Sequence, residues 1–280
     1  LERGIEKRIK AMLLGEVPEQ GSLLADRGYA DDWIEPVLDQ VEQDQGFPLN
    51  EEQRAGAVMP FRHSVSLLTG GAGVGKTTVL RAILRLAQGK HLRVFQMALA
   101  GRAAKRMTES TGHPAMTIAK FLHDAKAGQI TLAGDSLVVI DEASMLDLPT
   151  LYRILRFMPD GARLLLVGDP AQLPPIGFGL VFHRLVSSAL VPATNLVQVH
   201  RQAESTGIPA VAAAIRRHEI PEIKLYEGKK PGVSFIACDT FDVVDVLRRL
   251  ANEWSGEDFQ VLSAVKGGFG GIEFINGTFH

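Results

Sequence analysis

Short apolar runs alternate with amphipathic stretches from residue 64 onward, and this alternation predicts an α/β fold. Four runs bounded by turn residues are typical of buried strands in a parallel sheet: residues 64–70, 91–99, 136–143 and 162–169. Helical periodicity predicts helices between them, near residues 76–88, 101–111, 117–125 and 149–157. We therefore expect a doubly wound, mostly parallel sheet.

Two further regions flank this α/β domain. Apolar residues recur at helical spacing within residues 1–46, which predicts an N-terminal helical segment over residues 1–47. Asn50, with Gln53 three residues later, is typical of a capping box that opens the next helix. We expect the first α/β domain to span residues 48–200.

The last part of the chain, residues 201–280, reads as the beginning of a second α/β domain. Its pattern predicts helices at about 207–217 and 240–254, and strands at 233–238 and 259–265. These elements are too few to cover both faces of a second sheet, so we expect this domain to be incomplete.

Composition limits the class of protein. Hydrophobic residues make up 46% of the 280 residues and charged residues 22%, and no run approaches the roughly 18 apolar residues of a membrane span. The single cysteine, Cys238, excludes an intramolecular disulfide and favours reducing surroundings. We expect a cytoplasmic protein without a membrane partner.

Because the net charge is -2, nucleic acid would have to bind a local basic groove. The chain begins with leucine, so we expect it to be truncated.

A phosphate-binding loop follows the first predicted strand. Residues 70–77, GGAGVGKT, match the pattern G-x-x-x-x-G-K-[ST] between a strand and a helix. In such loops the backbone N–H groups surround the phosphates, the lysine reaches the β and γ phosphates, and the threonine hydroxyl binds Mg²⁺. The residues that we expect to hold the nucleotide are Gly71, Gly73, Val74, Gly75, Lys76, Thr77 and Thr78.

Two carboxylates follow the third predicted strand. Asp141 and Glu142 end the run LVVIDEAS, at the edge of the sheet where open α/β folds bind ligands. Asp141 is expected to hold Mg²⁺ with Thr77, and Glu142 to polarise the attacking water. The chain is therefore expected to bind, and to hydrolyse, a nucleoside triphosphate.

The order of the motifs resembles superfamily 1 helicases, and within them the RecD-like 5′-to-3′ branch that includes the α subunit of exodeoxyribonuclease V. The segments that carry this resemblance are LNEEQ (49–53), GGAGVGKTT (70–78), AGRAAKRM (100–107), TIAKFL (117–122), VVIDEASM (138–145), VGDPAQLPPIG (167–177) and VHRQAESTGI (199–208). The resemblance implies RecA-like domains, ATP with Mg²⁺, single-stranded DNA as a partner, and a role in recombination or repair. Other subunits of a recombination nuclease complex are further candidate partners.

The resemblance also implies roles for three polar residues outside the phosphate loop. Gln53 would contact adenine, Gln172 the γ-phosphate, and Arg201 the charge on the transferring phosphoryl group. An amide can hydrogen-bond a phosphate, and arginine presents a rigid fork of donors. From the residues alone, a surface capping box remains the alternative for Gln53, and a surface ion pair the alternative for Arg201.

A single-stranded DNA track is implied at Arg102, Lys105, Arg106 and Thr117. A solvated helix face is the alternative for the three basic residues. The chain has Ala119 where the family usually has histidine. Residues 126–135 occupy the place of the family's duplex-parting pin, so a small pin near 123–135 and a plain connector are both open.

Two later motifs of the family's second domain are missing from the chain. The first hypothesis is an ATP-dependent 5′-to-3′ DNA helicase of RecD type. The alternatives are a nucleotide-binding regulatory subunit of a nuclease complex that does not translocate, and the helicase part of a conjugative relaxase.

Overall fold

The computed structural model describes residues 1–14, 33–198 and 206–279. The chain divides into two compact units, Leu1–His200 and Arg201–His280, and each is a separate body. None of the helices in these described ranges is both long and apolar enough to cross a bilayer.

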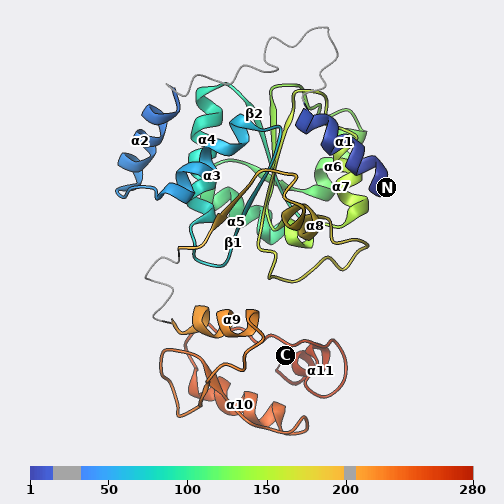
Figure 1. The fold of residues 1–280 in the computed structure, drawn as a ribbon. Coiled ribbons are helices and arrows are strands. Elements are labelled where there is room, and N and C mark those ends of the chain that lie inside the picture. The colour runs from blue at the N-terminus through green and yellow to red at the C-terminus, as the bar shows by residue number, and fades with distance from the viewer. Residues whose placement is uncertain (15–32, 199–205, 280) are drawn as a thin grey trace. The chain divides into compact units, whose positions relative to one another are not determined.

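The first unit is built on a sheet of six parallel strands (Figure 1). Its strands are β1 (Val65–Gly70), β2 (Arg93–Ala98), β3 (Ala115–Thr117), β4 (Ser136–Ile140), β5 (Arg163–Gly168) and β6 (Ala193–Leu196). They lie in the order β3-β2-β4-β5-β1-β6. The four strands predicted from apolar runs form the centre, and the shorter β3 and β6 are added at the two edges. The predicted doubly wound α/β class is confirmed.

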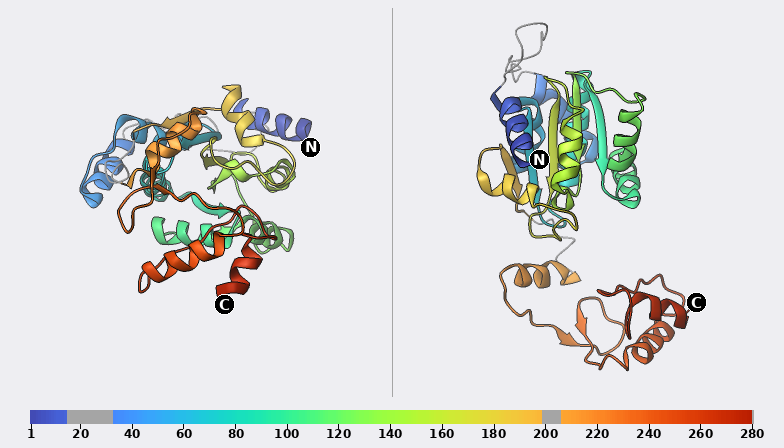
Figure 2. Two further views of the ribbon diagram at one scale, coloured as in Figure 1. Left: turned by 90° about the horizontal axis from the view of Figure 1, so that it is seen from below. Right: turned by 90° about the vertical axis from the view of Figure 1, so that its right-hand side faces the viewer.

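Helices cover both faces of this sheet (Figures 1 and 2). One face carries α1 (Glu2–Leu14), α6 (Ile118–Lys126), α7 (Leu148–Leu155) and α8 (Val181–Ser188). The other face carries α2 (Ile34–Gln45), α3 (Glu51–Arg62), α4 (Lys76–Gly89) and α5 (Gly101–Thr111). Because β1, β4 and β5 bury apolar side chains on both faces, two hydrophobic cores form, one under each helix layer.

The two N-terminal helices pack on opposite faces of the sheet. Ile5 and Ile9 of α1 lie in the core beneath α6 and α7, whereas Ile34 and Leu38 of α2 lie in the core beneath α3 and α4. The apolar stripe of each helix is therefore buried against the α/β layers. These helices are part of the first unit.

The second unit is small and has little core. It contains α9 (Ile208–Arg216), β7 (Lys224–Leu225), β8 (Ser234–Phe235), α10 (Val243–Glu253) and α11 (Ile272–Phe279). Both predicted helices are confirmed, and β8 falls within the predicted strand 233–238. The predicted strand at 259–265 is wrong: that segment is irregular, and Leu262 in it is 82% exposed. Between residues 206 and 279, Ile275 is the sole buried hydrophobic side chain.

Candidate functional site

Three motifs leave the sheet side by side at its carboxyl edge. β5 lies between β1 and β4, with Thr69 of β1 paired to Gly168 and Ile140 of β4 paired to Leu166. The phosphate loop follows β1, the carboxylate pair follows β4, and the glutamine turn follows β5. Parallel strand order thus brings together segments that are up to about a hundred residues apart in sequence, at the edge where such folds bind ligands.

The loop after β1 wraps around the lysine side chain. Gly73 (φ 77°) and Gly75 (φ 91°) adopt left-handed conformations that glycine reaches without steric cost. Val74 is 3% exposed and anchors the loop in the core under α4. The Lys76 ammonium donates hydrogen bonds to two carbonyls of the loop, those of Gly70 (2.7 Å) and Gly71 (2.6 Å). The cation therefore lies within the loop that matches the phosphate-binding pattern.

The two threonines of the motif stand at the start of α4. Thr77 is exposed and Thr78 is half-buried in the first helical turn. A hydroxyl at this position lies beside the backbone N–H groups of a helix N-terminus. A helix N-terminus favours the binding of negatively charged groups such as phosphate.

The carboxylate pair after β4 has an unusual backbone. The Asp141 N–H donates to the Met97 carbonyl of β2 (2.9 Å), and the Glu142 N–H donates to the Asp141 carboxylate (2.8 Å). Glu142 lies in the left-handed region at φ 54°, ψ 36°. This conformation carries a steric cost in free energy for any residue that has a Cβ atom. This conformation leaves the Glu142 side chain exposed to solvent.

Burial raises the pKa of the Asp141 carboxyl. The Glu142 N–H and the positive charge of Lys76 oppose this shift, which remains upward. Asp141 is half-buried, and the charge of Lys76 interacts electrostatically with its carboxylate. A further cation would stabilise the ionised form of Asp141.

The turn after β5 is held by its aspartate. Asp169 is 2% exposed, its carboxylate accepts from the Ala171 N–H (3.0 Å), and its carbonyl accepts from the Gln172 N–H (3.0 Å). Gln172 itself is exposed. The turn therefore fixes the backbone of Gln172 and presents its amide to solvent at the same edge as the phosphate loop.

The motif LNEEQ forms the predicted capping box at the start of α3. The Asn50 side chain accepts from the Gln53 N–H (2.8 Å), and the Gln53 side chain accepts from the Asn50 N–H (3.1 Å). Gln53 is 1% exposed, so it is buried and not the surface residue that the alternative interpretation required.

The same helix start is tied to the segment that follows β6. The Asn50 amide donates to Gln198 (3.1 Å), and the Glu52 carboxylate accepts from the Val197 N–H (2.9 Å). The chain then enters residues 199–205, and Arg201 lies outside the described residues. Sequence reasoning did not find these two contacts, because nothing in the local pattern pairs residues about 150 positions apart.

The residues expected to meet DNA lie on helix α5 and at the end of strand β3, directly before α6. Arg102, Lys105 and Arg106 are exposed on α5, where Lys105 pairs with Glu109 (3.8 Å). The Thr117 hydroxyl caps α6 by accepting from a backbone N–H one turn later (3.1 Å). Both helices begin after strands β2 and β3 at the carboxyl edge.

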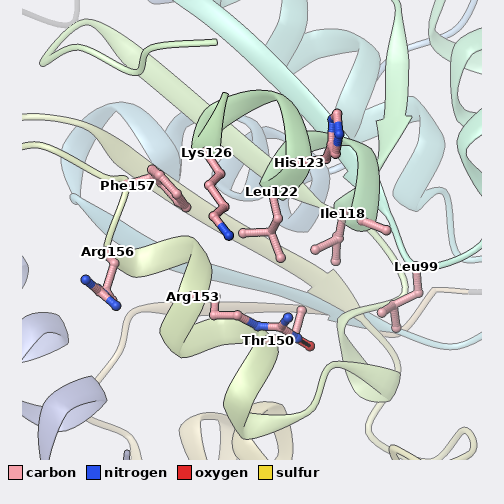
Figure 3. A pocket seen from close by; sticks show the side chains of 10 residues that line it. Leu99, Ile118, Leu122, His123, Lys126, Thr150, Arg153, Arg156 and Phe157 are labelled. Carbon is pink, nitrogen blue, oxygen red and sulfur yellow. Dashed lines mark hydrogen bonds between the residues drawn. The ribbon is translucent and has the colours of Figure 1, made fainter. Parts of the chain in front are cut away.

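A pocket of about 710 Å³ opens between α6 and α7. Figure 3 shows Leu122 and Lys126 of α6 facing α7. Its apolar lining includes Leu99, Ile118 and Phe157, and its basic lining residues are His123, Lys126, Arg153 and Arg156. Ala119 lines it too, at the position where the family usually has the larger histidine. Arg153 and Arg156 were missed at the sequence level, although their spacing of three predicts one shared helix face.

Residues 127–135, which join α6 to β4, contain no strand. Their backbone is held by two bonds to the Asp124 carbonyl, from the N–H groups of Gln129 (2.8 Å) and Ile130 (3.3 Å). The segment has the form of the plain connector that the sequence left open.

A protein-family model described as an AAA domain matches residues 48–231. The chain belongs to the AAA domain family. This AAA domain chain is 36% identical over 201 residues to the ATP-dependent RecD2 DNA helicase of Deinococcus radiodurans, a match that covers 70% of this chain and 27% of that protein. It is 32% identical over 197 residues to RecBCD enzyme subunit RecD of Mycolicibacterium smegmatis, covering 59% of this chain and 35% of that protein.

Among solved structures, a Pif1 helicase from Candida albicans matches the AAA domain chain with a TM-score of 0.48 at 22% identity, covering 77% of this chain and 59% of that one. The RecD relatives confirm the resemblance to RecD-like helicases that the ordered motifs predict. The chain spans only 27% and 35% of the lengths of these two relatives.

Proposed function

We propose that this chain is the nucleotide-binding motor part of an ATP-dependent DNA helicase of RecD type, which moves 5′ to 3′ on single-stranded DNA in the cytoplasm during recombination or repair. The observation that carries the proposal is the meeting of the phosphate loop, the carboxylate pair and the Gln172 turn on three adjacent strands. The RecD relatives support two parts of the proposal: that ATP binds at this edge, and that the motor acts on DNA.

In the proposed reaction the loop binds the triphosphate and the two carboxylates act on metal and water. Lys76 exchanges its bonds to the loop carbonyls for the β and γ phosphates, and the loop N–H groups surround them. Glu142 polarises the attacking water, and Gln172 contacts the γ-phosphate from the neighbouring turn. Arg201 stabilises the charge on the transferring group.

Magnesium fits the donor set at this edge. The exposed Thr77 hydroxyl and the half-buried Asp141 carboxylate are hard oxygen ligands, which Mg²⁺ prefers together with water and phosphate oxygens. When bound, the metal neutralises charge on the phosphates. We assign Thr77 and Asp141 to hold it.

Single-stranded DNA is proposed to follow the same edge past α5 and α6. The exposed positive charge comes from Arg102, Lys105 and Arg106, and Thr117 supplies a hydroxyl for the DNA backbone. The pocket between α6 and α7 adds both apolar and basic lining residues, a combination suited to stacked bases and phosphates. Such binding is largely independent of sequence and weakens as salt rises.

ATP turnover with and without single-stranded DNA tests the motor proposal. We expect DNA to raise turnover in a protein that contains this chain together with the two later helicase motifs. Lys76→Ala should abolish nucleotide binding, and Glu142→Gln should keep binding while losing hydrolysis. Lys7→Ala, which removes an exposed lysine of α1, is the matched control and should leave both unchanged. Turnover that ignores DNA would contradict the motor.

A second candidate is a nucleotide-dependent subunit of a nuclease complex that does not translocate. The match to a RecBCD enzyme subunit supports this second candidate. This candidate predicts nucleotide binding and a protein partner, without unwinding of a duplex that carries a 5′ single-stranded tail. Unwinding by the protein alone excludes it.

A further inference from the structure

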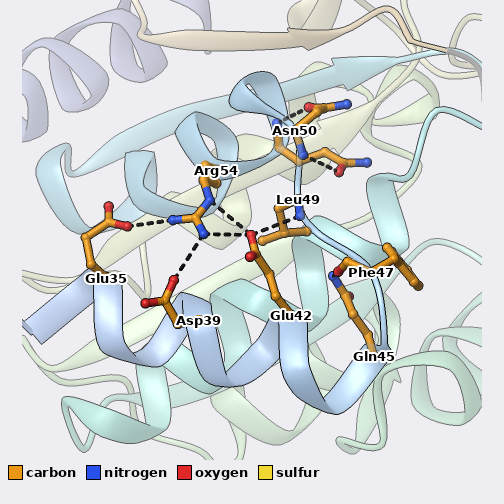
Figure 4. Close-up of polar contacts among 9 residues, drawn as sticks. Glu35, Asp39, Glu42, Gln45, Phe47, Leu49, Asn50 and Arg54 are labelled. Atoms are coloured by element: carbon orange, nitrogen blue, oxygen red, sulfur yellow. Dashed lines mark hydrogen bonds and ion pairs between the residues drawn. The ribbon is translucent and has the colours of Figure 1, made fainter.

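Arg54, the residue directly after Gln53, contacts three carboxylates of a neighbouring helix (Figure 4). Its guanidinium pairs with Glu35 (2.5 Å), Asp39 (3.2 Å) and Glu42 (2.7 Å) of α2. A second bond joins its Nε to the same oxygen of Glu42 (3.0 Å). The three acids are spaced by four and three residues and so share one face of α2.

Glu42 extends this contact to the linker between the two helices. The carboxylate oxygen that binds Arg54 also accepts from the Leu49 N–H (2.9 Å). Leu49 immediately precedes Asn50, the N-cap of α3, and is 5% exposed. Gly46, in a left-handed conformation, closes the end of α2 with a bond to the Glu42 carbonyl (2.9 Å). One acid therefore holds both the linker and the first turn of α3.

The first turn of α3 is the turn that carries Gln53. The Arg54 N–H makes the first helical bond to the Asn50 carbonyl (2.9 Å), and the capping box joins Asn50 to Gln53. A rotation or slip of this turn would move the Gln53 amide. The contacts of Arg54 with α2 oppose such a movement from the outer side of the helix.

An ordinary surface ion pair would contribute little to such positioning. This one differs in geometry. The Arg54 side chain is 30% exposed and that of Glu42 is 18% exposed, and four bonds in a fixed fork converge on one guanidinium. Arginine donates in a planar fork, so it loses less freedom per bond than lysine would.

We propose that Arg54 is a positioning residue for the base end of the nucleotide site: held by the acidic face of α2, it fixes the first turn of α3 and thereby directs the Gln53 amide to the base. This inference rests on the proposed function and on the contact of Gln53 with adenine that the resemblance to RecD-like helicases implies. It gives α2 a role in the nucleotide site, beyond covering the sheet.

The test separates recognition of the base from recognition of the phosphates. Binding of Mg²⁺-ATP and of Mg²⁺-tripolyphosphate, which lacks the base and sugar, is measured by calorimetry on wild type, Arg54→Met, Arg54→Lys and Glu42→Gln. Wild type should bind ATP more tightly than tripolyphosphate. Arg54→Met should weaken ATP by about tenfold, the size of one or two lost hydrogen bonds, and leave tripolyphosphate within about twofold. Glu42→Gln should weaken ATP in the same selective way but less, and Arg54→Lys should recover only part.

Arg85→Met is the matched control. Arg85 also joins α2 to a neighbouring helix, through Asp44 (3.1 Å), but both side chains are exposed and the contact joins α2 to α4 instead of α3. It should leave both affinities unchanged. Adding Gln53→Ala to Arg54→Met should cause little further loss of the preference for ATP, because both changes act on one contact.

The outcomes are distinct. The proposal is overturned if Arg54→Met and Glu42→Gln weaken ATP and tripolyphosphate equally, which would mean a general structural role, or if they weaken neither. It also fails if wild type binds the two ligands equally, since there is then no base contact to position. If wild type binds neither ligand, the proposed nucleotide site itself is wrong.

Discussion

The left-handed backbone of Glu142 predicts an inverted order of stability for two small substitutions. An L-residue in this region costs about 1–2 kcal/mol, and glycine avoids that cost. At an ordinary helical position glycine is instead less stable than alanine by about 0.5–1 kcal/mol, because it loses more backbone entropy on folding. Since Glu142 lies at φ 54°, ψ 36°, Glu142→Gly should be more stable than Glu142→Ala by about 1 kcal/mol.

The control is the same pair of substitutions at Lys7, an exposed position in the middle of α1. There Lys7→Gly should be less stable than Lys7→Ala by about 0.5–1 kcal/mol. Comparing glycine with alanine at each site cancels the loss of the original side chain, so the remaining difference reports the backbone.

Urea unfolding of the four variants gives the free energies, and thermal melts should differ by about 2–4 °C per kcal/mol. Neither Glu142 variant should hydrolyse ATP, because both lack the carboxylate. If Glu142→Ala equals or exceeds Glu142→Gly in stability, the backbone at this position is not strained and the reasoning is refuted. The inverted order would mean that the candidate site stores conformational strain.

Two further predictions concern the core and pH. Phe121→Ala, at a side chain with no exposed surface, should lower the free energy of unfolding by about 3–5 kcal/mol in urea titrations, whereas Phe178→Ala, at a side chain that is 70% exposed, should change it little. Hydrogen bonds from Lys120 and His123 lower the pKa of the Asp124 carboxyl. Its stabilising effect is thus present above its unfolded pKa and is lost as pH falls through the lower folded pKa. Asp124→Asn should therefore destabilise the protein at pH 7, and in matched denaturation curves this loss should shrink as pH falls below the ordinary pKa of aspartate; an equal loss at every pH would contradict this.

Strands with strong local signals could be predicted, and strands that depend on a partner could not. β1, β4 and β5 are apolar on both faces because both faces are buried, which makes each run conspicuous in the sequence. β3 and β6 are edge strands of three and four residues and are largely half-buried or exposed. Their backbones become strands through pairing with β2 and β1.

The second unit illustrates the opposite error. Residues 259–265 have the apolar composition of a strand, but a strand also needs a neighbour to satisfy its backbone groups. The sheet described in this unit consists of two residue pairs, between β7 and β8, and offers 259–265 no place. Pattern alone therefore overestimated the sheet.

The sequence by itself determined which motifs stand at the carboxyl edge: the glycine-rich loop after β1, the carboxylate pair after β4 and the glutamine turn after β5. Those motifs are local, because each needs only a few neighbouring residues and a strand end. The tertiary structure alone decided that α1 and α2 pack on opposite faces, that Gln53 is buried, and that Arg54 meets three acids of α2. Such contacts depend on how distant segments pack, and no short pattern in the chain records that.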